Sequence, residues 1–408
     1  MTGKLFLYAT LSILGGAVLL GFFVLFSQEE TPLAKEQQDL FAEKNLLPTT
    51  KEPLKEMSPS FLPEEIRGIY LTRWSAGSTT KLNQLLFLAK EAGVNAVVID
   101  VKDSLGFLTY DTNVPLAEEI GAGQGNIKDM KGYLALLHNA GLYTIARITV
   151  FQDPLLAKAR PDLAIKRASK EDEIWTDRKG LAWVDPASYD VWKYNVAIAK
   201  DAIAQGFDEI NFDYIRFPSD GDIFDTTYPF WNEETPIEEI IASFFAYLRE
   251  ELKGAVISVD LFGLVTVNTW SDMGIGQILE DAFLYFNFIS PMVYPSHFAE
   301  GFLGFEHPDE YPYEVVRFSM AQAKERLQKS NSTAKLRPWL QYFDLKGSNI
   351  SYTSAVVKEQ ILATKEALGE KYTGYLLWNS ANNYPVEDIK TIMLGLSKES
   401  SNEEIPGL

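Results

Sequence analysis

The chain contains no cysteine among its 408 residues. No disulfide, zinc–thiolate site or cysteine nucleophile can therefore form. Histidine is also scarce, and its three examples are His138, His297 and His307. This scarcity argues against a metal centre built from several histidines. The composition thus leads us to expect neither a bound metal nor a cofactor.

Basic residues are outnumbered: 37 Lys and Arg stand against 56 Asp and Glu, which gives a formal net charge of −19. Nucleic acids and anionic lipid surfaces attract basic proteins, so this balance argues against either as the main partner. An acidic surface also keeps a protein soluble, which is the simpler interpretation. With 46% hydrophobic residues, the chain can bury the core of one large domain.

One long uncharged run stands at the N-terminus. Residues 5–26 are mostly apolar and long enough to cross a bilayer as a helix. The run lacks a small-x-small cleavage site, which favours an uncleaved anchor over a signal peptide. Lys4 before the run predicts an N-terminus inside the cell and the remainder outside. The predicted organisation is a transmembrane anchor, a flexible linker, a folded domain and a disordered tail, over residues 1–27, 28–63, 64–396 and 397–408.

In the folded domain, short apolar segments alternate with helical patterns. The expected strands are 68–74, 96–101, 143–151, 209–217, 256–262, 286–294, 336–343 and 374–378. The expected helices are near 80–92, 127–140, 189–205, 236–252, 275–282, 313–329, 353–368 and 386–395. This α/β alternation predicts a (β/α)8 TIM barrel. A doubly wound sheet is the alternative, but Thr72-Arg73-Trp74 stands where a Gly-rich phosphate turn would follow the first strand.

The connections between these elements are of two lengths. Segments that enter strands are short: 92–95, 139–141, 205–207 and 253–255. Segments that leave strands are long: 104–126, 152–188, 219–235, 263–274 and 296–312. Barrel enzymes build their active sites from the loops at the C-terminal ends of the strands. The asymmetry therefore predicts an enlarged ligand cleft at that end.

The expected strand 209–217 carries polar side chains within an apolar run. The period of two directs Asn211 and Asp213 inward and Tyr214 towards the helices. A buried carboxylate is costly unless it is paired, but the C-terminal end of a barrel strand is where such enzymes do their chemistry. The next expected strand likewise directs Asp260 inward. We expect the two carboxyl groups to face each other at similar heights.

Two facing carboxyl groups are what glycoside hydrolysis requires. We expect Asp213 to act as nucleophile or base and Asp260 as acid, with Asp103 and Asp344 as reserves. One carboxylate must stay ionised while desolvation raises the pKa of the other. The cations available for this purpose are Lys102, Arg147 and Arg216.

Sugar rings present apolar faces to aromatic side chains and hydroxyl groups to polar ones. The expected substrate-binding residues lie near the C-terminal ends of the predicted strands: Asp100, Lys102, Arg147, Asn211, Tyr214, Arg216, Tyr294, His297, Trp339, Gln341, Trp378 and Trp74. Within this set, the period of two places Asp100 and Lys102 on the same side of their strand.

Each carboxylate also has a structural explanation. Asp213 can form an ion pair with Arg216 at the strand end, and Asp100 can pair with Lys102 or Arg147. The others precede turns or loops, whose backbone an aspartate often caps: Asp103, Asp260 and Asp344.

Several of these residues lie in motifs that resemble a known family. The motifs are Arg67-Gly68-Ile69-Tyr70, Val98-Ile99-Asp100-Val101-Lys102-Asp103 with Gly106 and Tyr110, Phe212-Asp213-Tyr214-Ile215-Arg216-Phe217-Pro218, and Ser290-Pro291-Met292-Val293-Tyr294-Pro295. Together they resemble the bacterial "putative glycoside hydrolase domain" family, first catalogued as a domain of unknown function within the TIM-barrel glycosidase clan. The resemblance covers about residues 65–395. It implies a (β/α)8 fold and carbohydrate substrates, and no catalytic assignment.

Three functions are compatible with these features. The first is a membrane-anchored glycoside hydrolase that faces outward and acts on a cell-wall or extracellular polysaccharide. The second is a catalytically inactive carbohydrate-binding barrel or surface scaffold, which would bind glycan without releasing sugar. The third is a divalent-metal enzyme with Asp100, Asp213 and Asp260 as oxygen ligands, whose activity strong chelation would abolish.

Overall fold

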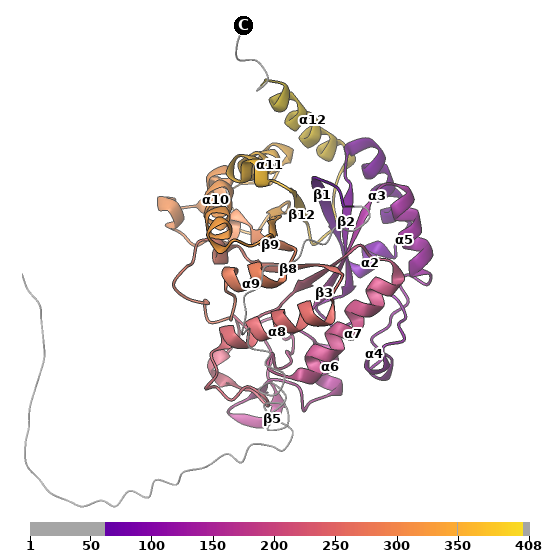
Figure 1. The fold of residues 1–408 in the computed structure, drawn as a ribbon, viewed down its shortest axis with the longest axis vertical. Coiled ribbons are helices and arrows are strands. Elements are labelled where there is room, and N and C mark those ends of the chain that lie inside the picture. The colour runs from indigo at the N-terminus through magenta and orange to yellow at the C-terminus, as the bar shows by residue number, and fades with distance from the viewer. Residues whose placement is uncertain (1–61, 349, 403–408) are drawn as a thin grey trace, which may run out of the picture.

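The structure is a closed parallel β-barrel surrounded by helices (Figure 1). It is a computed structural model that describes residues 62–348 and 350–402. The barrel strands are β1 (Ile66–Leu71), β2 (Ala96–Lys102), β3 (Tyr143–Thr149), β6 (Glu209–Asp213), β8 (Val256–Phe262), β9 (Phe288–Val293), β10 (Lys335–Leu336), β11 (Trp339–Gln341) and β12 (Gly374–Trp378). β10 and β11 together occupy one of the eight strand positions, and parallel pairing runs from β12 through β1 round to β9 and β11. The predicted TIM barrel is confirmed, and the doubly wound alternative is wrong.

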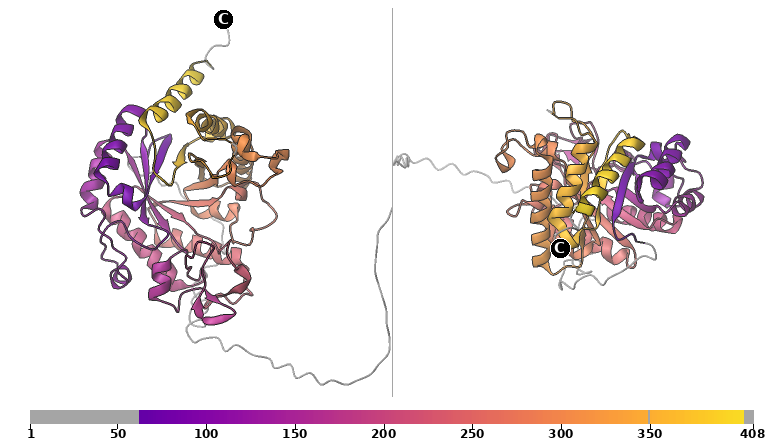
Figure 2. Two further views of the ribbon diagram at one scale, coloured as in Figure 1. Left: turned by 180° about the vertical axis from the view of Figure 1, so that it is seen from behind. Right: turned by 90° about the horizontal axis from the view of Figure 1, so that it is seen from above.

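Helices follow the strands and form the outer ring. They are α2 (Arg73–Ala76), α3 (Thr79–Ala92), α4 (Pro115–Glu119), α5 (Met130–Asn139), α6 (Pro154–Ala159), α7 (Tyr189–Gln205), α8 (Ile237–Glu251), α9 (Leu279–Tyr285), α10 (Pro312–Ser330), α11 (Ser354–Leu368) and α12 (Val386–Asn402). Figure 2 shows the three last helices side by side, and α12 also contacts α3. This contact between the first and last long helices closes the ring, as the strands close the barrel.

The structure does not describe residues 1–61 and 403–408 at the two ends of the chain. The predicted anchor at 1–27 and nearly all of the predicted linker at 28–63 fall outside the described residues. Within residues 62–348 and 350–402, none of the helices has the length and apolar character needed to cross a membrane. At the other end, α12 continues to Asn402, past the predicted domain boundary at 396.

The ends of the helices are encoded locally. Helix α3 begins after Ser78, whose hydroxyl accepts a hydrogen bond from the Lys81 amide, and it ends at Gly93 with φ of 69°. Helix α7 repeats this arrangement with Ser188 at its start and Gly206, φ 115°, at its end. Serine at an N-cap satisfies an otherwise free amide, and glycine adopts the left-handed conformation without a Cβ clash. The short connections into the strands follow directly from these glycine stops.

The long connections that leave the strands carry structure of their own. Segment 152–188 contains α6 and the strands β4 (Lys166–Arg167) and β5 (Lys170–Ile174). β4 also pairs with β7 (Thr226–Thr227) from segment 219–235, so that two separate loops form one three-stranded sheet. β5 lies at the lower edge of the molecule in Figure 1. This small sheet was not predicted from the sequence.

Polar residues fill part of the barrel interior. At the N-terminal end, Arg337 forms a fully buried ion pair with Glu209, which also accepts a hydrogen bond from the Tyr143 hydroxyl. The Arg337 guanidinium lies 4.3 Å from the ring centroid of Phe288. The attraction within such a pair and its hydrogen bonds offset part of the cost of burying both charges. This cluster therefore closes the barrel at the end opposite the long loops.

The prediction that Lys102 shares the inward side with Asp100 is wrong. The pairing of β2 with β3 shifts between these residues, because Asp100 lies opposite Arg147 and Lys102 opposite Ile148. This β-bulge adds one residue to β2 and turns Lys102 outward. Its ammonium group lies 2.8 Å from both Asp153 Oδ2 and Asn195 Oδ1, between barrel and helices. Lys102 is thus a buried structural cation and is not available to substrate.

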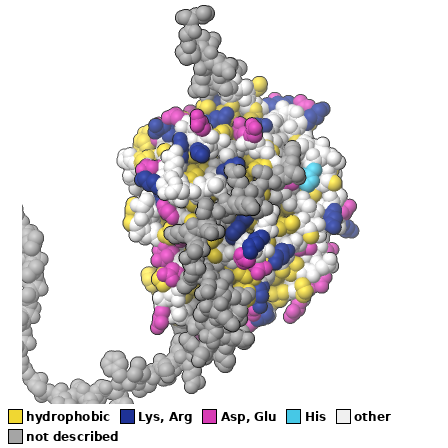
Figure 3. Space-filling view, in the orientation of Figure 1, with side chains coloured by type: hydrophobic (Ala, Val, Ile, Leu, Met, Phe, Trp, Pro, Cys, Tyr) yellow, Lys and Arg dark blue, Asp and Glu magenta, His cyan; other side chains and the backbone are white. Residues whose placement is uncertain are grey.

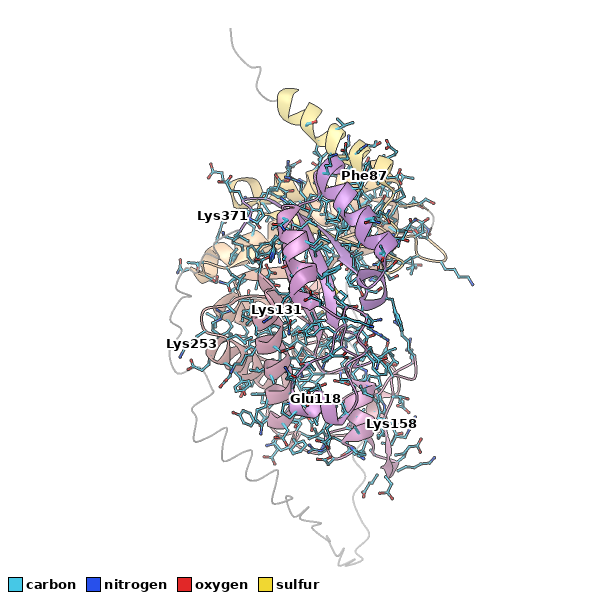
Figure 4. All side chains as sticks on the ribbon, turned by 90° about the vertical axis from the view of Figure 1, so that its right-hand side faces the viewer. Phe87, Glu118, Lys131, Lys158, Lys253 and Lys371 are labelled. Carbon is cyan, nitrogen blue, oxygen red and sulfur yellow. The ribbon has the colours of Figure 1, made fainter. Side chains whose placement is uncertain are left out.

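The outer surface shows no segregation of charge on the face seen in Figure 3, where acidic and basic side chains are interspersed over the described residues. Exposed side chains on the outer helices include Phe87, Lys131 and Lys158 (Figure 4). Barrel enzymes place their active sites at the C-terminal ends of the strands.

Candidate active site

A cleft of about 810 Å³ opens at the C-terminal ends of β3, β6, β8, β9 and β12. Its volume is within the range of small-molecule and oligosaccharide sites. The residues that line it are Arg147, Lys179, Asp213, Tyr214, Arg216, Ser219, Asp220, Phe262, Gly263, Leu264, Met292, Tyr294, His297, Phe298, Ala299, Glu300, Phe302, Phe343, Trp378 and Ser380. Four of the long loops contribute to this lining, as the loop lengths predicted.

Arg147 is the centre of the polar floor. Its Nη1 donates to Asp100 Oδ1 at 2.5 Å, its Nη2 donates to Asp213 Oδ2, and its Nε lies 3.7 Å from Asp260 Oδ2. Burial acts to lower the pKa of Arg147, but the carboxylates, Asp213 and Asp100 foremost, raise it well above its ordinary value. One permanent cation therefore serves three buried carboxyl groups.

Three carboxyl groups around one cation cannot all be ionised at low cost. Burial raises the pKa of Asp260 to about 8, and the neighbouring Asp213 carboxylate adds to that rise. Asp260 Oδ1 accepts hydrogen bonds of 2.8 Å from Asn211 Nδ2 and Trp339 Nε1. Burial also raises the pKa of Asp100, which accepts a 2.5 Å hydrogen bond from the Tyr70 hydroxyl. The raised pKa favours the protonated form of Asp260 beside Asp213.

The backbone is strained next to Asp213. Strand β6 ends at Asp213, and Tyr214 has a φ of 52°, which a non-glycine residue adopts only at a cost. The Tyr214 amide donates to Asp213 Oδ1 at 2.6 Å. This turn ends the strand alternation, so Tyr214, which alternation directs towards the helices, instead lines the cleft. The conformation also fixes the Asp213 carboxylate at the cleft floor.

An aromatic group borders the same floor. Trp378 stacks on Tyr70 with ring centroids 4.1 Å apart and planes at 20°, and Trp339 meets the Trp378 ring edge-on at 5.4 Å. The Arg147 guanidinium lies 5.2 Å from the Trp378 centroid. Of these three rings, Trp378 lines the cleft. An aromatic face beside a carboxylate suits the apolar face of a sugar ring.

The structure sorts the predicted site residues into three sets. Those that line the cleft are Asp213, Arg147, Tyr214, Arg216, Tyr294, His297 and Trp378. Those that lie buried beneath or beside it are Asp260, Asp100, Asn211, Trp339 and Gln341. Those that it places away from the lining are Lys102, Asp103, Asp344 and Trp74. No ion pair forms between Asp213 and Arg216 among the described residues, because Arg147 takes that place.

The two reserve carboxylates have structural partners instead. Asp103 accepts hydrogen bonds from the backbone of Leu105 and Phe107 and from Arg73 Nε, which organises the loop after β2. Asp344 accepts one from the Tyr352 amide at 2.7 Å. Trp74 is 65% exposed and lies under the Arg73 guanidinium. Turn chemistry explains both aspartates without a role in the cleft.

Apart from His297, sequence reasoning missed the charged loop residues that line the cleft. Lys179, Asp220 and Glu300 line the cleft from three different long segments. These segments have no hydrophobic period that would indicate where a side chain points. Their length alone signalled that they contribute.

The carboxylates proposed as metal ligands are arranged around an arginine. Asp100, Asp213 and Asp260 all lie within 4.0 Å of Arg147 nitrogen atoms. Among the residues that the structure describes, no group of three or more His, Cys, Asp or Glu side chains is arranged to hold a metal ion. The Arg147 guanidinium therefore occupies the position between the three carboxyl groups where a metal enzyme would hold its metal ion.

A further buried aspartate fixes the loop that carries Asp220. Asp185 Oδ2 accepts hydrogen bonds from the amides of Phe230 and Trp231, at 2.7 and 3.1 Å, and Oδ1 accepts one from Ala187. Burial raises the pKa of Asp185 to about 6, against the opposing effect of these three donors. Segments 152–188 and 219–235 are thereby tied together on one side of the cleft.

Replacing Asp185 with Ala should lower the free energy of unfolding by about 3 kcal/mol, because three buried amides lose their acceptor. Hydrogen exchange at Phe230 and Trp231 should accelerate by at least about tenfold. Asp185→Asn keeps one acceptor oxygen and should show a smaller effect. Equal exchange rates in wild type and Asp185→Ala would contradict this role.

Comparison with known proteins bears on the identity of this cleft. A family model described as "Putative glycosyl hydrolase domain" matches residues 68–384, nearly the whole barrel. The chain belongs to this family. A search of curated proteins found no match.

Solved structures agree on the architecture. A hypothetical protein from Ruminiclostridium thermocellum ATCC 27405 is 38% identical over 47% of this chain and 96% of its own, with a TM-score of 0.44. The PgaB (BpsB) glycoside hydrolase domain from Bordetella bronchiseptica is 14% identical over 81% of this chain and 99% of its own, with a TM-score of 0.57. Alpha-L-fucosidase isoenzyme 2 from Paenibacillus thiaminolyticus is 12% identical over 83% of this chain and 50% of its own, with a TM-score of 0.50. At such low identity, the last two show that this family member shares the barrel fold of glycoside hydrolases.

Proposed function

We propose that this family member is a glycoside hydrolase that acts on a polysaccharide, with Asp213 as the carboxylate that reacts at the sugar. The observation that carries the proposal is the unequal pair at the cleft floor. Asp213 forms an ion pair with Arg147 and faces the cleft, whereas burial raises the pKa of Asp260 to about 8. Environments that separate two neighbouring carboxyl groups in this way are typical of acid and base pairs.

The mechanism also needs a second carboxyl group, which acts as the general acid. Asp260 has the pKa of a general acid, but its side chain is 1% exposed and does not line the cleft. Besides Asp213, the described residues that offer carboxyl groups to the cleft are Asp220 and Glu300. We propose that Asp260 is the proton-holding member of the pair, and that variants of Asp220 and Glu300 identify which group meets the leaving oxygen.

The pH dependence tests Asp260. If hydrolysis requires Asp260 to be protonated, the rate falls about tenfold per unit as the pH rises above about 8. The Asp260→Asn variant cannot ionise and keeps the acceptor oxygen for Asn211 and Trp339, so its profile should lack this fall. The measurement is the initial rate between pH 5 and pH 10 on any polysaccharide that wild type cleaves. A fall at the same pH in the variant would assign the titration to another group.

A complete loss of activity at all pH values in Asp260→Asn would instead make Asp260 the direct proton donor. Asp220→Asn and Glu300→Gln serve as parallel variants, since both side chains line the cleft and neither belongs to the buried cluster around Arg147. The variant that loses activity only towards substrates with poor leaving groups carries the acid. A screen of residues 63–402, which include the whole of α12, against peptidoglycan and other polysaccharides supplies the substrate.

The position of Asp260 beneath the cleft lining also favours a second function, a carbohydrate-binding barrel without hydrolysis. Trp378, Tyr294 and Arg147 would then hold a glycan without cleaving it. Binding on a glycan array without released sugar after prolonged incubation would support this function. Released sugar that depends on Asp213 would exclude it.

We propose from the sequence alone that residues 5–26 anchor the protein in the membrane, with the barrel outside and a cell-wall or extracellular polysaccharide as substrate. Protease added to intact cells should then digest the barrel. Protection of the barrel until the cells are lysed would contradict this orientation.

A further inference from the structure

Arg216 is a buried cation at the cleft with no carboxylate partner. Its side chain is 8% exposed and lines the cleft beside Asp213. Its one hydrogen bond within the described residues runs from Nη1 to the Phe217 carbonyl oxygen at 3.0 Å, and it takes part in none of their ion pairs. Four of the five N–H groups of its guanidinium therefore have no acceptor among the residues that the structure describes.

Aromatic rings hold this guanidinium in place. It lies 4.7 Å from the ring centroid of Phe262, 4.9 Å from that of Trp183 and 5.2 Å from that of Tyr214. The face of an aromatic ring attracts a cation. It does not accept the hydrogen bonds that the guanidinium N–H groups donate in the plane of the guanidinium. The side chain is thus fixed in orientation while its donors stay free, which is the condition for bidentate recognition of an anion.

Arg216 and Arg147 are both buried at the cleft floor but differ in their surroundings. Carboxylates raise the pKa of Arg147 well above its ordinary value, whereas burial lowers the pKa of Arg216. Tyr214 opposes that lowering most, followed by the aspartates Asp213, Asp220 and Asp177. Asp177 is itself engaged by donors from Gln152, Trp183 and the backbone. The charge on Arg216 is desolvated, and within the described structure only the Phe217 carbonyl and the three aromatic rings compensate for this.

A second cation lines the same side of the cleft. Lys179 follows Asp177 in the long loop after β5, and its ammonium group belongs to none of the ion pairs among the described residues. Arg216 and Lys179 thus both line the cleft without an ion-pair partner among the described residues, although Lys179 is exposed to solvent. Asp220 and Glu300 also line the cleft, so the positive charge is local to Arg216 and Lys179.

We propose that Arg216, assisted by Lys179, binds a carboxylate group of the substrate, and that the substrate is an acidic polysaccharide. The carboxylate-bearing sugar lies next to the bond that reacts at Asp213, because Arg216 and Asp213 line the same cleft three residues apart. The substrate class rests on the proposed hydrolase function, whereas the anion subsite stands independently of it. The acidic surface repels such a polymer only at long range, and salt screens that repulsion beyond about 8 Å at physiological ionic strength.

The test measures binding separately from hydrolysis. Asp213→Asn protein is titrated with polygalacturonate, hyaluronan and peptidoglycan glycan chains, each beside its own carboxyl-reduced form. We expect one acidic polymer to bind at least about tenfold more tightly than its reduced partner. Adding Arg216→Gln should weaken that binding by about 10- to 100-fold and leave the reduced form unaffected. Arg216→Lys keeps the charge without the planar fork and should lie between the two.

Arg317→Gln is the matched control, because Arg317 is exposed on α10, pairs with Glu366, and neither residue lines the cleft. Thermal unfolding of each variant shows whether it is folded. A purely structural role for Arg216 would weaken binding of acidic and reduced polymers equally, and that result would overturn the subsite. So would the absence of any acidic preference in Asp213→Asn protein.

The two proposals fail in different ways. If wild type cleaves a neutral polysaccharide in a manner that needs Asp213 but tolerates Arg216→Gln, the hydrolase function stands and the acidic substrate is wrong. If an acidic polymer binds through Arg216 but wild type never cleaves it, the subsite stands and the hydrolase function loses its support.

Discussion

Replacing Asp213 with Asn is expected to reduce hydrolysis by at least about 10³-fold while leaving the barrel folded. The asparagine has the same shape, and its oxygen can still accept from Arg147 or from the Tyr214 amide. What is lost is the negative charge at the one carboxylate of the Arg147 cluster that lines the cleft. Neither a nucleophile nor a general base can function without that charge.

The measurement is sugar released from whichever polysaccharide wild type cleaves, with thermal unfolding recorded alongside. Asp129→Asn is the matched control, because Asp129 caps α5 at the surface and asparagine is an equally good cap. Asp103→Asn and Asp344→Asn should retain most activity, since both aspartates organise loops. If Asp213→Asn kept wild-type turnover, the reacting carboxylate would have to be sought at Asp220 or Glu300.

The barrel could be predicted from the sequence because its elements are local. Strand β8 and helix α7 have the bounds that alternation and helical periodicity predict, 256–262 and 189–205. Each such element buries one face, and its residues repeat at a fixed spacing. The order of strands in the sheet then follows from the alternation of strands and helices.

The errors arise where a single backbone angle or one extra residue breaks the repeat. The bulge in β2 moves Lys102 from the interior to the helix layer, and the positive φ of Tyr214 moves that ring from the helices into the cleft. No composition or periodicity signals either event. The pairing of β4 with β7 is missed for a related reason, because it joins residues far apart in the chain.

The site could be predicted in part because several of its residues lie at regular positions on the barrel strands. Asp213, Asn211 and Asp260 occupy regular strand positions, and Asn211 donates to Asp260 across neighbouring strands. Arg147 was expected among several cations, but its central place among three carboxylates depends on the register of β2, β3 and β6. The loop residues Lys179, Asp220 and Glu300 obey no such register, and their places are defined by tertiary contacts alone.

Replacing Arg147 with Met should lower the free energy of unfolding by about 3–5 kcal/mol at pH 8, because it leaves three buried carboxyl groups without their cation. The loss should be smaller at pH 5. Asp260 and Asp100 have pKa values raised above those of the unfolded chain, so the folded state binds protons more tightly than the unfolded state. Stability from these groups is present at low pH and is lost as the pH rises through their folded pKa values, about 8 for Asp260.

Removing the cation should make the free energy of unfolding depend more strongly on pH, because Arg147 opposes the rise in pKa of both Asp100 and Asp260. Denaturant unfolding of wild type and Arg147→Met at pH 5, 6.5 and 8 provides the measurement. Arg317→Met is the control, since it breaks an exposed pair that solvent screens, and its effect should be small at all three pH values. An equal loss at all three pH values would mean that Arg147 supports the barrel by packing alone. In that case the difference between Asp213 and Asp260 on which the proposed chemistry depends would have a cause other than Arg147.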